Sequence, residues 1–250
     1  ATHQQLGDAE TMVERDELDP LVARIIAGRG VAPESAASFL NPTLRDLMPD
    51  PSTLTQMDVA AARLADAVER RQRVAIFGDY DVDGATSSAL MWKFLDHCGV
   101  EAEIYIPDRI FEGYGPNEPA IDQLIDRGAG LLVTVDCGST SHDAIARARS
   151  RQVDVVVLDH HQVGDTLPDA VALVNPNRDD DLSGQGHLCA AGVVFLTLVA
   201  VSRELRNRQY FNDQRKPPNL MAWLDLVALG TVCDVVPLKE LNRAFVLRGI

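Results

Sequence analysis

Short apolar runs alternate with stretches of helical periodicity along most of this chain, and this alternation limits the available folds more than any other feature. Each run has four to six residues and is bounded by turn residues, a pattern typical of buried strands. Strands that alternate with helices form a parallel sheet covered by those helices. We therefore expect an α/β fold, a parallel sheet with helices on both faces. The expected strands are 74–77, 102–106, 131–135, 153–158 and 170–174, and the expected helices are 57–68, 87–97, 119–126, 142–149, 192–205 and 220–227.

Charge and composition exclude several classes of function. The 250 residues include 37 acids and 23 bases, a formal net charge of −14, which argues against a basic coat that binds nucleic acid over the whole surface. The apolar runs are far shorter than the roughly 20 residues of a membrane helix, and no export signal opens the chain. We expect a cytoplasmic protein without membrane contact. The four cysteines are far apart and form no CxxC pair, which favours buried thiols over a zinc site or a disulfide.

Aspartates follow three of the expected strands, at the sheet edge where parallel α/β sheets bind their ligands. Carboxylates gathered there repel one another unless cations neutralise them. Oxygen ligands with one or two imidazoles suit Mn²⁺ or Mg²⁺, and a pair of such ions serves phosphoester hydrolysis. A merely structural acidic cluster is the alternative, because a lone Asp after a strand is often only a turn or helix cap. The segments are Gly78-Asp79-Tyr80-Asp81-Val82-Asp83-Gly84, Asp136-Cys137-Gly138 and Asp159-His160-His161, with Asp234 in a fourth apolar context.

The ordered series of motifs resembles the DHH phosphoesterase superfamily, named for a triplet like Asp159-His160-His161, and within it the RecJ family of exonucleases. The resemblance runs from about residue 18 to the end of the chain. It implies a metal-dependent 5′-to-3′ exonuclease that hydrolyses single-stranded DNA to 5′-mononucleotides in DNA repair and recombination. Two ions, Mn²⁺ or Mg²⁺, would be its cofactors, and a helicase and a single-strand-binding protein its partners. Other segments that carry the resemblance are Arg29-Gly30-Val31, Phe39-Leu40-Asn41-Pro42, Ile106-Pro107-Asp108-Arg109, Gly113-Tyr114-Gly115 and residues 230–238.

The resemblance also implies a role for each motif residue. Asp81 would bind one ion and Asp83 the other, with Asp136 as the bridge. His160 and Asp234 would complete the second site, and His161 would contact the scissile phosphate. The full expected set is Asp79, Asp81, Asp83, Asp136, His160 and Asp234 as metal ligands, His161, Asp136 and Asp159 as catalytic residues, and Arg109, Tyr114, Ser87 and Ser88 as substrate-binding residues, the two serines at the opening of a helix.

The domain organisation follows from the polarity and periodicity of the N-terminal residues together with the resemblance. We expect a polar tail at 1–17, a small helical N-terminal layer at 18–56 and the DHH catalytic domain at 57–238. A helix beginning at 239 would lead to a second domain that this sequence does not contain.

Two features and three alternative functions stay open. Phe77 stands where many family members have a histidine, which puts the strength of the first metal site in doubt. Bases and aromatic residues at 203–216 fit either a segment that tracks single-stranded DNA or a solvated helix. The alternative functions are a DHH-type pyrophosphatase, an oligonucleotide or cyclic-dinucleotide phosphodiesterase, and an inactive DNA-binding scaffold.

Overall fold

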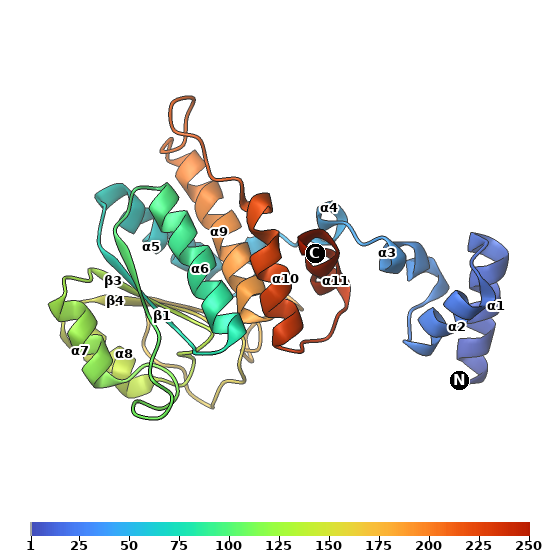
Figure 1. Cartoon of the computed structure of the whole chain (residues 1–250), viewed down its shortest axis with the longest axis horizontal. Helices are drawn as coiled ribbons and strands as arrows, with labels where there is room; N and C mark the ends of the chain where they lie inside the picture. The colour runs from blue at the N-terminus through green and yellow to red at the C-terminus, as the bar shows by residue number, and fades with distance from the viewer. Residues whose placement is uncertain (1) are drawn as a thin grey trace.

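A computed structural model describes residues 2–250, and a five-stranded parallel sheet forms its centre (Figure 1). The strand order is β2-β1-β3-β4-β5. In this order the chain leaves β1 in one direction to β2 and then crosses back to β3, so the edge between β1 and β3 is the topological switch point, where open α/β sheets bind ligands. The strands are β1 (Val74–Gly78), β2 (Ala102–Tyr105), β3 (Leu131–Val135), β4 (Asp154–Leu158) and β5 (Ala172–Val174).

Helices cover both faces of the sheet, as the sequence predicts. One face and its large apolar core lie under α5 (Met57–Arg70), α6 (Val82–His97) and α9 (Ala190–Asn207). The other face, with a smaller core, lies under α7 (Glu118–Asp126) and α8 (His142–Ser150) (Figure 1). The parallel α/β architecture predicted from alternating runs is therefore confirmed.

Two further helices extend the larger core. α10 (Leu224–Cys233) packs against α6 and α9, and α11 (Glu240–Gly249) packs against α10. No helix among residues 2–250 combines the length and apolar character needed to cross a membrane.

The N-terminal helices form a separate lobe instead of the layer that the sequence predicts. α1 (His3–Asp16), α2 (Pro20–Gly28) and α3 (Ala36–Leu40) share a small core of their own and stand to one side of the sheet (Figure 1). The short helix α4 (Leu44–Leu47) contacts α11 and connects the lobe to the body. The apolar stripes of α1 and α2 pack on each other and not on the sheet.

The polar tail expected at 1–17 is also wrong in structural terms, because 3–16 is helical. A capping box joins Thr2 and Gln5, so two of the free N–H groups at the start of α1 are satisfied. Ala9 and Met12 are buried against α2. Their spacing of three residues is typical of a helix, but the polar residues around them made this pattern hard to recognise. The domain limits themselves stay a prediction.

Candidate metal centre

The connection from β1 to α6 brings three aspartates to the switch point. Asp79 follows the buried strand directly, and Asp81 caps α6 by accepting a hydrogen bond from the Gly84 N–H at 2.9 Å. A Cβ at Gly84 would overlap the carbonyl oxygen of Asp79, so only glycine allows the chain to turn this tightly. The tight turn places the carboxylates of Asp79 and Asp81 on the same edge of the sheet.

Asp83 connects the starts of two helices. Its side chain is buried in the first turn of α6, where it accepts hydrogen bonds from the N–H groups of Ala190 at 2.6 Å and Ala191 at 3.0 Å. Those groups belong to the first turn of α9, whose dipole also favours a negative charge. Burial raises the pKa of Asp83, while these hydrogen bonds oppose the rise.

Asp136, directly after β3, has an energetically unfavourable backbone conformation and side-chain environment. Its φ is 61°, a left-handed conformation that is uncommon for residues other than glycine. The side chain is 1% exposed, and neither carboxylate oxygen has a hydrogen-bond partner. Burial, and then the charges of Asp83 and Asp81, raise its pKa to about 10. Two unpartnered buried oxygens among other carboxylates are the arrangement that a divalent cation neutralises.

Asp159, after β4, is in the opposite state because its hydrogen bonds are satisfied. One carboxylate oxygen accepts from the N–H groups of His160 and His161 and lies 2.8 Å from His161 Nδ1, and the other accepts from Ser139 N–H. Burial would raise the pKa of Asp159, but the hydrogen bonds and charge of His161, with those of Ser139, lower it to about 2. Asp159 therefore orients the two histidines.

His160 reaches the centre of the cluster. Its Nε2 is buried, has no hydrogen-bond partner and lies 3.3 Å from an Asp136 oxygen, 3.6 Å from Asp234 and 3.8 Å from Asp83. Asp234 arrives from the C-terminal cap of α10. Three groups of donor atoms lie close enough to hold an ion: Asp79 with Asp81 and Asp136, Asp83 with His160 and Asp234, and Asp136 with His160 and His161. All six residues expected as ligands are thus brought together, and Asp136 lies between the two sides.

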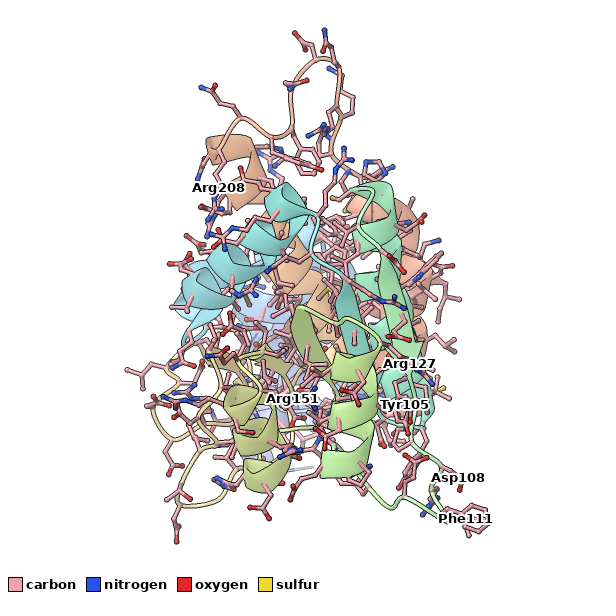
Figure 2. The ribbon with its side chains drawn as sticks, turned by 90° about the vertical axis from the view of Figure 1, so that its left-hand side faces the viewer. Tyr105, Asp108, Phe111, Arg127, Arg151 and Arg208 are labelled. Atoms are coloured by element: carbon pink, nitrogen blue, oxygen red, sulfur yellow. The ribbon has the colours of Figure 1, made fainter. Side chains whose placement is uncertain are left out.

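The loop after β2 carries two of the expected substrate-binding residues to this edge. The Arg109 guanidinium lies 5.0 Å from the centre of the Tyr80 ring, and Tyr80 in turn meets Tyr114 edge-on. The Tyr114 hydroxyl donates to the Asp136 carbonyl at 3.3 Å, and its ring meets His161 edge-on. Figure 2 shows this loop projecting beyond the sheet, with Asp108 and Phe111 at its tip.

Ser87 and Ser88 do not open a helix, as the sequence analysis expected. α6 starts earlier, at the Asp81 cap, so both serines lie in the second turn of that helix, and both are at most 1% exposed. Neither hydroxyl has a hydrogen-bond partner, and Ser88 Oγ packs closely over Gly78. The prediction is wrong because the glycine after Asp83 resembles a turn signal but lies inside the helix.

Phe77 contributes nothing to the cluster. Its ring is fully buried on the other face of the sheet, in the core under α7 and α8, and lies 5.3 Å from the ring of Tyr105. The group of Asp79, Asp81 and Asp136 therefore offers only carboxylate oxygens, whereas the group around Asp234 includes an imidazole.

The basic and aromatic segment at 203–216 lies at the opposite end of the molecule. α9 begins beside Asp83, so its last turn and the following loop lie far from the cluster, and Figure 2 shows Arg208 at the end opposite Phe111. Arg203 pairs with Asp50, and Arg208 pairs with Asp66, Glu69 and Glu204. Arg203 and Arg208 are thus engaged in the fold, which favours the solvated-helix interpretation.

Sequence reasoning missed the residues that hold the DHH triplet in place. Asn175 donates to Ser139 Oγ at 2.8 Å and to the His161 carbonyl at 2.9 Å, and Asn177 donates to the His160 carbonyl. Asn175 follows β5 directly and Asn177 comes two residues later, so polar residues after the fifth strand were the signal that could have found them.

The fold and the cluster together define an α/β protein with a carboxylate and histidine centre suited to divalent cations. A family model described as the DHH family, N-terminal domain, matches residues 73–231. The chain belongs to this DHH family.

The relatives point to one group within the family. The single-stranded-DNA-specific exonuclease RecJ of Salmonella typhimurium is 40% identical over 94% of this chain and 40% of the relative, and that of Bacillus subtilis is 36% identical over 96% and 29%. The crystal structure of RecJ in complex with Mn²⁺ from Thermus thermophilus superposes with a TM-score of 0.76 at 30% identity, covering 98% of this chain and 33% of that one. The RecJ resemblance is therefore confirmed, and the chain spans less than half the length of these relatives.

Proposed function

We propose that this chain carries the catalytic centre of a metal-dependent 5′-to-3′ exonuclease that hydrolyses single-stranded DNA to 5′-mononucleotides. The observation that carries the proposal is Asp136, whose two buried oxygens lack partners between two groups of ligand atoms. The relatives named as single-stranded-DNA-specific exonucleases, and the Mn²⁺ and Mg²⁺ complexes among the solved structures, support the substrate and the cofactor.

The roles we assign follow the two groups of donor atoms. Asp79, Asp81 and Asp136 hold one ion, and Asp83, His160 and Asp234 hold the other, with Asp136 shared. When bound, the two ions supply a nucleophile from water at neutral pH and neutralise charge on the phosphoryl oxygens.

His161 is the group that meets the phosphate. Its side chain is 45% exposed, and the hydrogen bond that its Nδ1 donates to the Asp159 carboxylate raises its pKa, so the ring carries a proton at higher pH than a free histidine. The protonated ring donates from Nε2 to an oxygen of the scissile phosphate. Arg109, held over Tyr80, is placed to grip a second phosphate with its planar guanidinium.

Digestion of a 3′-labelled single-stranded oligonucleotide tests the proposal. With Mn²⁺ or Mg²⁺ we expect products that shorten from the 5′ end, and with EDTA no products. Hydrolysis of pyrophosphate or a cyclic dinucleotide in place of the oligonucleotide would favour the small-substrate alternatives. No turnover of any of them, despite Mn²⁺ binding by the same preparation, would contradict an active centre in this chain.

The proposal extends to the setting in which RecJ-type exonucleases would act. It places the chain in the cytoplasm, in DNA repair, alongside a helicase and a single-strand-binding protein. Co-purification of such proteins with the tagged full-length protein, but not with an untagged control, is the expected result.

Asp159→Asn should move the pH dependence of hydrolysis. Asp159 raises the pKa of His161, so activity that needs the protonated ring falls as pH rises through that value. Asparagine removes the negative charge, and the alkaline decline should therefore begin at lower pH. The pH profile of kcat with saturating Mn²⁺ measures this, and an unchanged profile would remove His161 from the proposed role.

A further inference from the structure

A basic cleft runs from the metal centre towards the N-terminal lobe, beneath the connection between α10 and α11. Its first part is a hollow of about 410 Å³ lined by Asn177, His187, Pro237 and Lys239, among others. Asn177 donates to the carbonyl of the ligand His160, so this hollow borders the cluster. Its second part, about 530 Å³, lies between 29–42 of the lobe and the start of α11, and Lys239 lines both parts. In Figure 1, α11 lies between the sheet and the N-terminal helices.

The cations of this cleft have no ion-pair partner among the described residues. Lys239, Arg29 and Arg243 line it, and none of them forms an ion pair with the residues at 2–250. Several arginines outside the cleft have acidic partners, as Arg147 and Arg151 do with Asp122. In a protein with a formal charge of −14, three unpaired cations along one cleft form a local site for a polyanion.

Arg243 is held in the cleft by contacts with Phe39 and forms no ion pair with the described residues, although Glu240 also lines this part of the cleft. Its guanidinium stacks 3.9 Å from the centre of the Phe39 ring, and its Nε donates to the Phe39 carbonyl at 3.0 Å. Burial lowers the pKa of Arg243, and the charge of Arg29 lowers it further. Two neighbouring cations that are not paired with an acid repel each other, and a phosphate between them relieves that repulsion.

The wall of the cleft near the metal centre is held in place by hydrogen bonds, but a buried polar atom in it lacks a hydrogen-bond partner. Asn242 is fully buried and donates to the carbonyls of His187 and Pro237, which fixes the two loops that face each other. His187 is 6% exposed, and its Nε2 has no hydrogen-bond partner, the nearest acid being Glu240 at 3.9 Å. A buried ring nitrogen without a partner at the wall of a cationic hollow indicates a ligand with hydrogen-bonding oxygens.

We propose that this cleft binds the phosphodiester backbone of the single strand on the 3′ side of the bond being cleaved. The inference rests on the proposed function, because a 5′ end at the metal centre leaves the remainder of the strand to be carried away from it. Lys239, beside the cluster, contacts the nearer phosphates, and Arg29 with Arg243 contacts those farther along.

Binding of a fluorescent 20-nucleotide strand, measured against salt concentration, tests the cleft. All chains carry Asp136→Asn to prevent cleavage, and the test variant adds Arg29→Gln and Lys239→Gln, two exposed cations. Each lost phosphate contact reduces the slope of log K against log salt by about 0.7 for single strands, so we expect a slope smaller by about 1.4 and binding about tenfold weaker at low salt. The matched control adds Arg71→Gln and Arg206→Gln, at the other end of the sheet, and should bind like the parent.

A second measurement separates this inference from the proposed function. In chains with Asp136 intact, the Arg29 and Lys239 variant should hydrolyse a dinucleotide at the wild-type rate, since so short a substrate does not reach the cleft. Equal slopes for parent and test variant, or weaker binding by the Arg71 and Arg206 control, would contradict the proposal that this cleft binds the strand. Slopes that differ as expected, with no digestion by the wild type, would support the cleft and contradict the proposed exonuclease.

Discussion

Asp136→Asn is expected to lower kcat for metal-dependent hydrolysis by about 10³-fold or more, while making the metal-free protein more stable above neutral pH. The loss of activity follows because Asp136 belongs to two of the three groups of ligand atoms, and a bound metal supplies several kcal/mol of transition-state stabilisation. Initial rates with Mn²⁺ over a range of concentrations measure the loss of kcat.

The gain in stability follows from the pKa of Asp136. In the folded metal-free protein this carboxyl keeps its proton up to about pH 10, whereas in the unfolded chain it loses the proton near 3.8. Unfolding therefore releases a proton between these values, and the free energy of unfolding falls as pH rises. Asparagine has no proton to lose, so melting curves in EDTA should separate as pH rises, with the variant melting higher. A variant less stable than wild type at pH 8 in EDTA would contradict the unpartnered state of Asp136.

Asp83→Ala is expected to lower the free energy of unfolding by about 3 kcal/mol even in EDTA, in addition to removing metal-dependent activity. The buried Asp83 carboxylate satisfies the N–H groups of Ala190 and Ala191, and its removal leaves both donors at the start of α9 without partners. Urea unfolding in EDTA measures the change.

Asp81→Ala is the matched comparison, since it also removes one carboxylate ligand from α6. Asp81 is exposed and only caps the helix through Gly84, so its loss should cost about 1 kcal/mol. If the two alanine variants were destabilised equally, Asp83 would not connect the two helices as described.

The three substitutions separate residues that the sequence presents as equivalent. Asp81, Asp83 and Asp136 all follow apolar runs, and each is expected to bind a metal ion. The effects of the three substitutions on the stability of the metal-free protein differ because the carboxylates have different partners. Asp81 caps a helix in solvent, Asp83 accepts hydrogen bonds from the N–H groups of a distant helix, and the Asp136 carboxylate has no hydrogen-bond partner.

Local sequence patterns were enough to predict the parallel α/β architecture and the composition of the cluster. Period and length are local properties, so apolar runs such as 131–135 predicted β3 to the residue. Parallel strands end at one edge, and the aspartates after β1, β3 and β4 therefore had to lie near one another.

The long-range features became visible only in the folded chain. They are the strand order that makes β1 and β3 neighbours, and the contact of Asp83 with α9, 107 residues further along the sequence. The tertiary structure also decided that Ser87 is buried, that the N-terminal helices form a lobe, and that Lys239 and Arg29 line one cleft. These features depend on which distant surfaces pack together, and the hydrophobic effect that drives such packing is non-directional, so no local pattern encodes the partner.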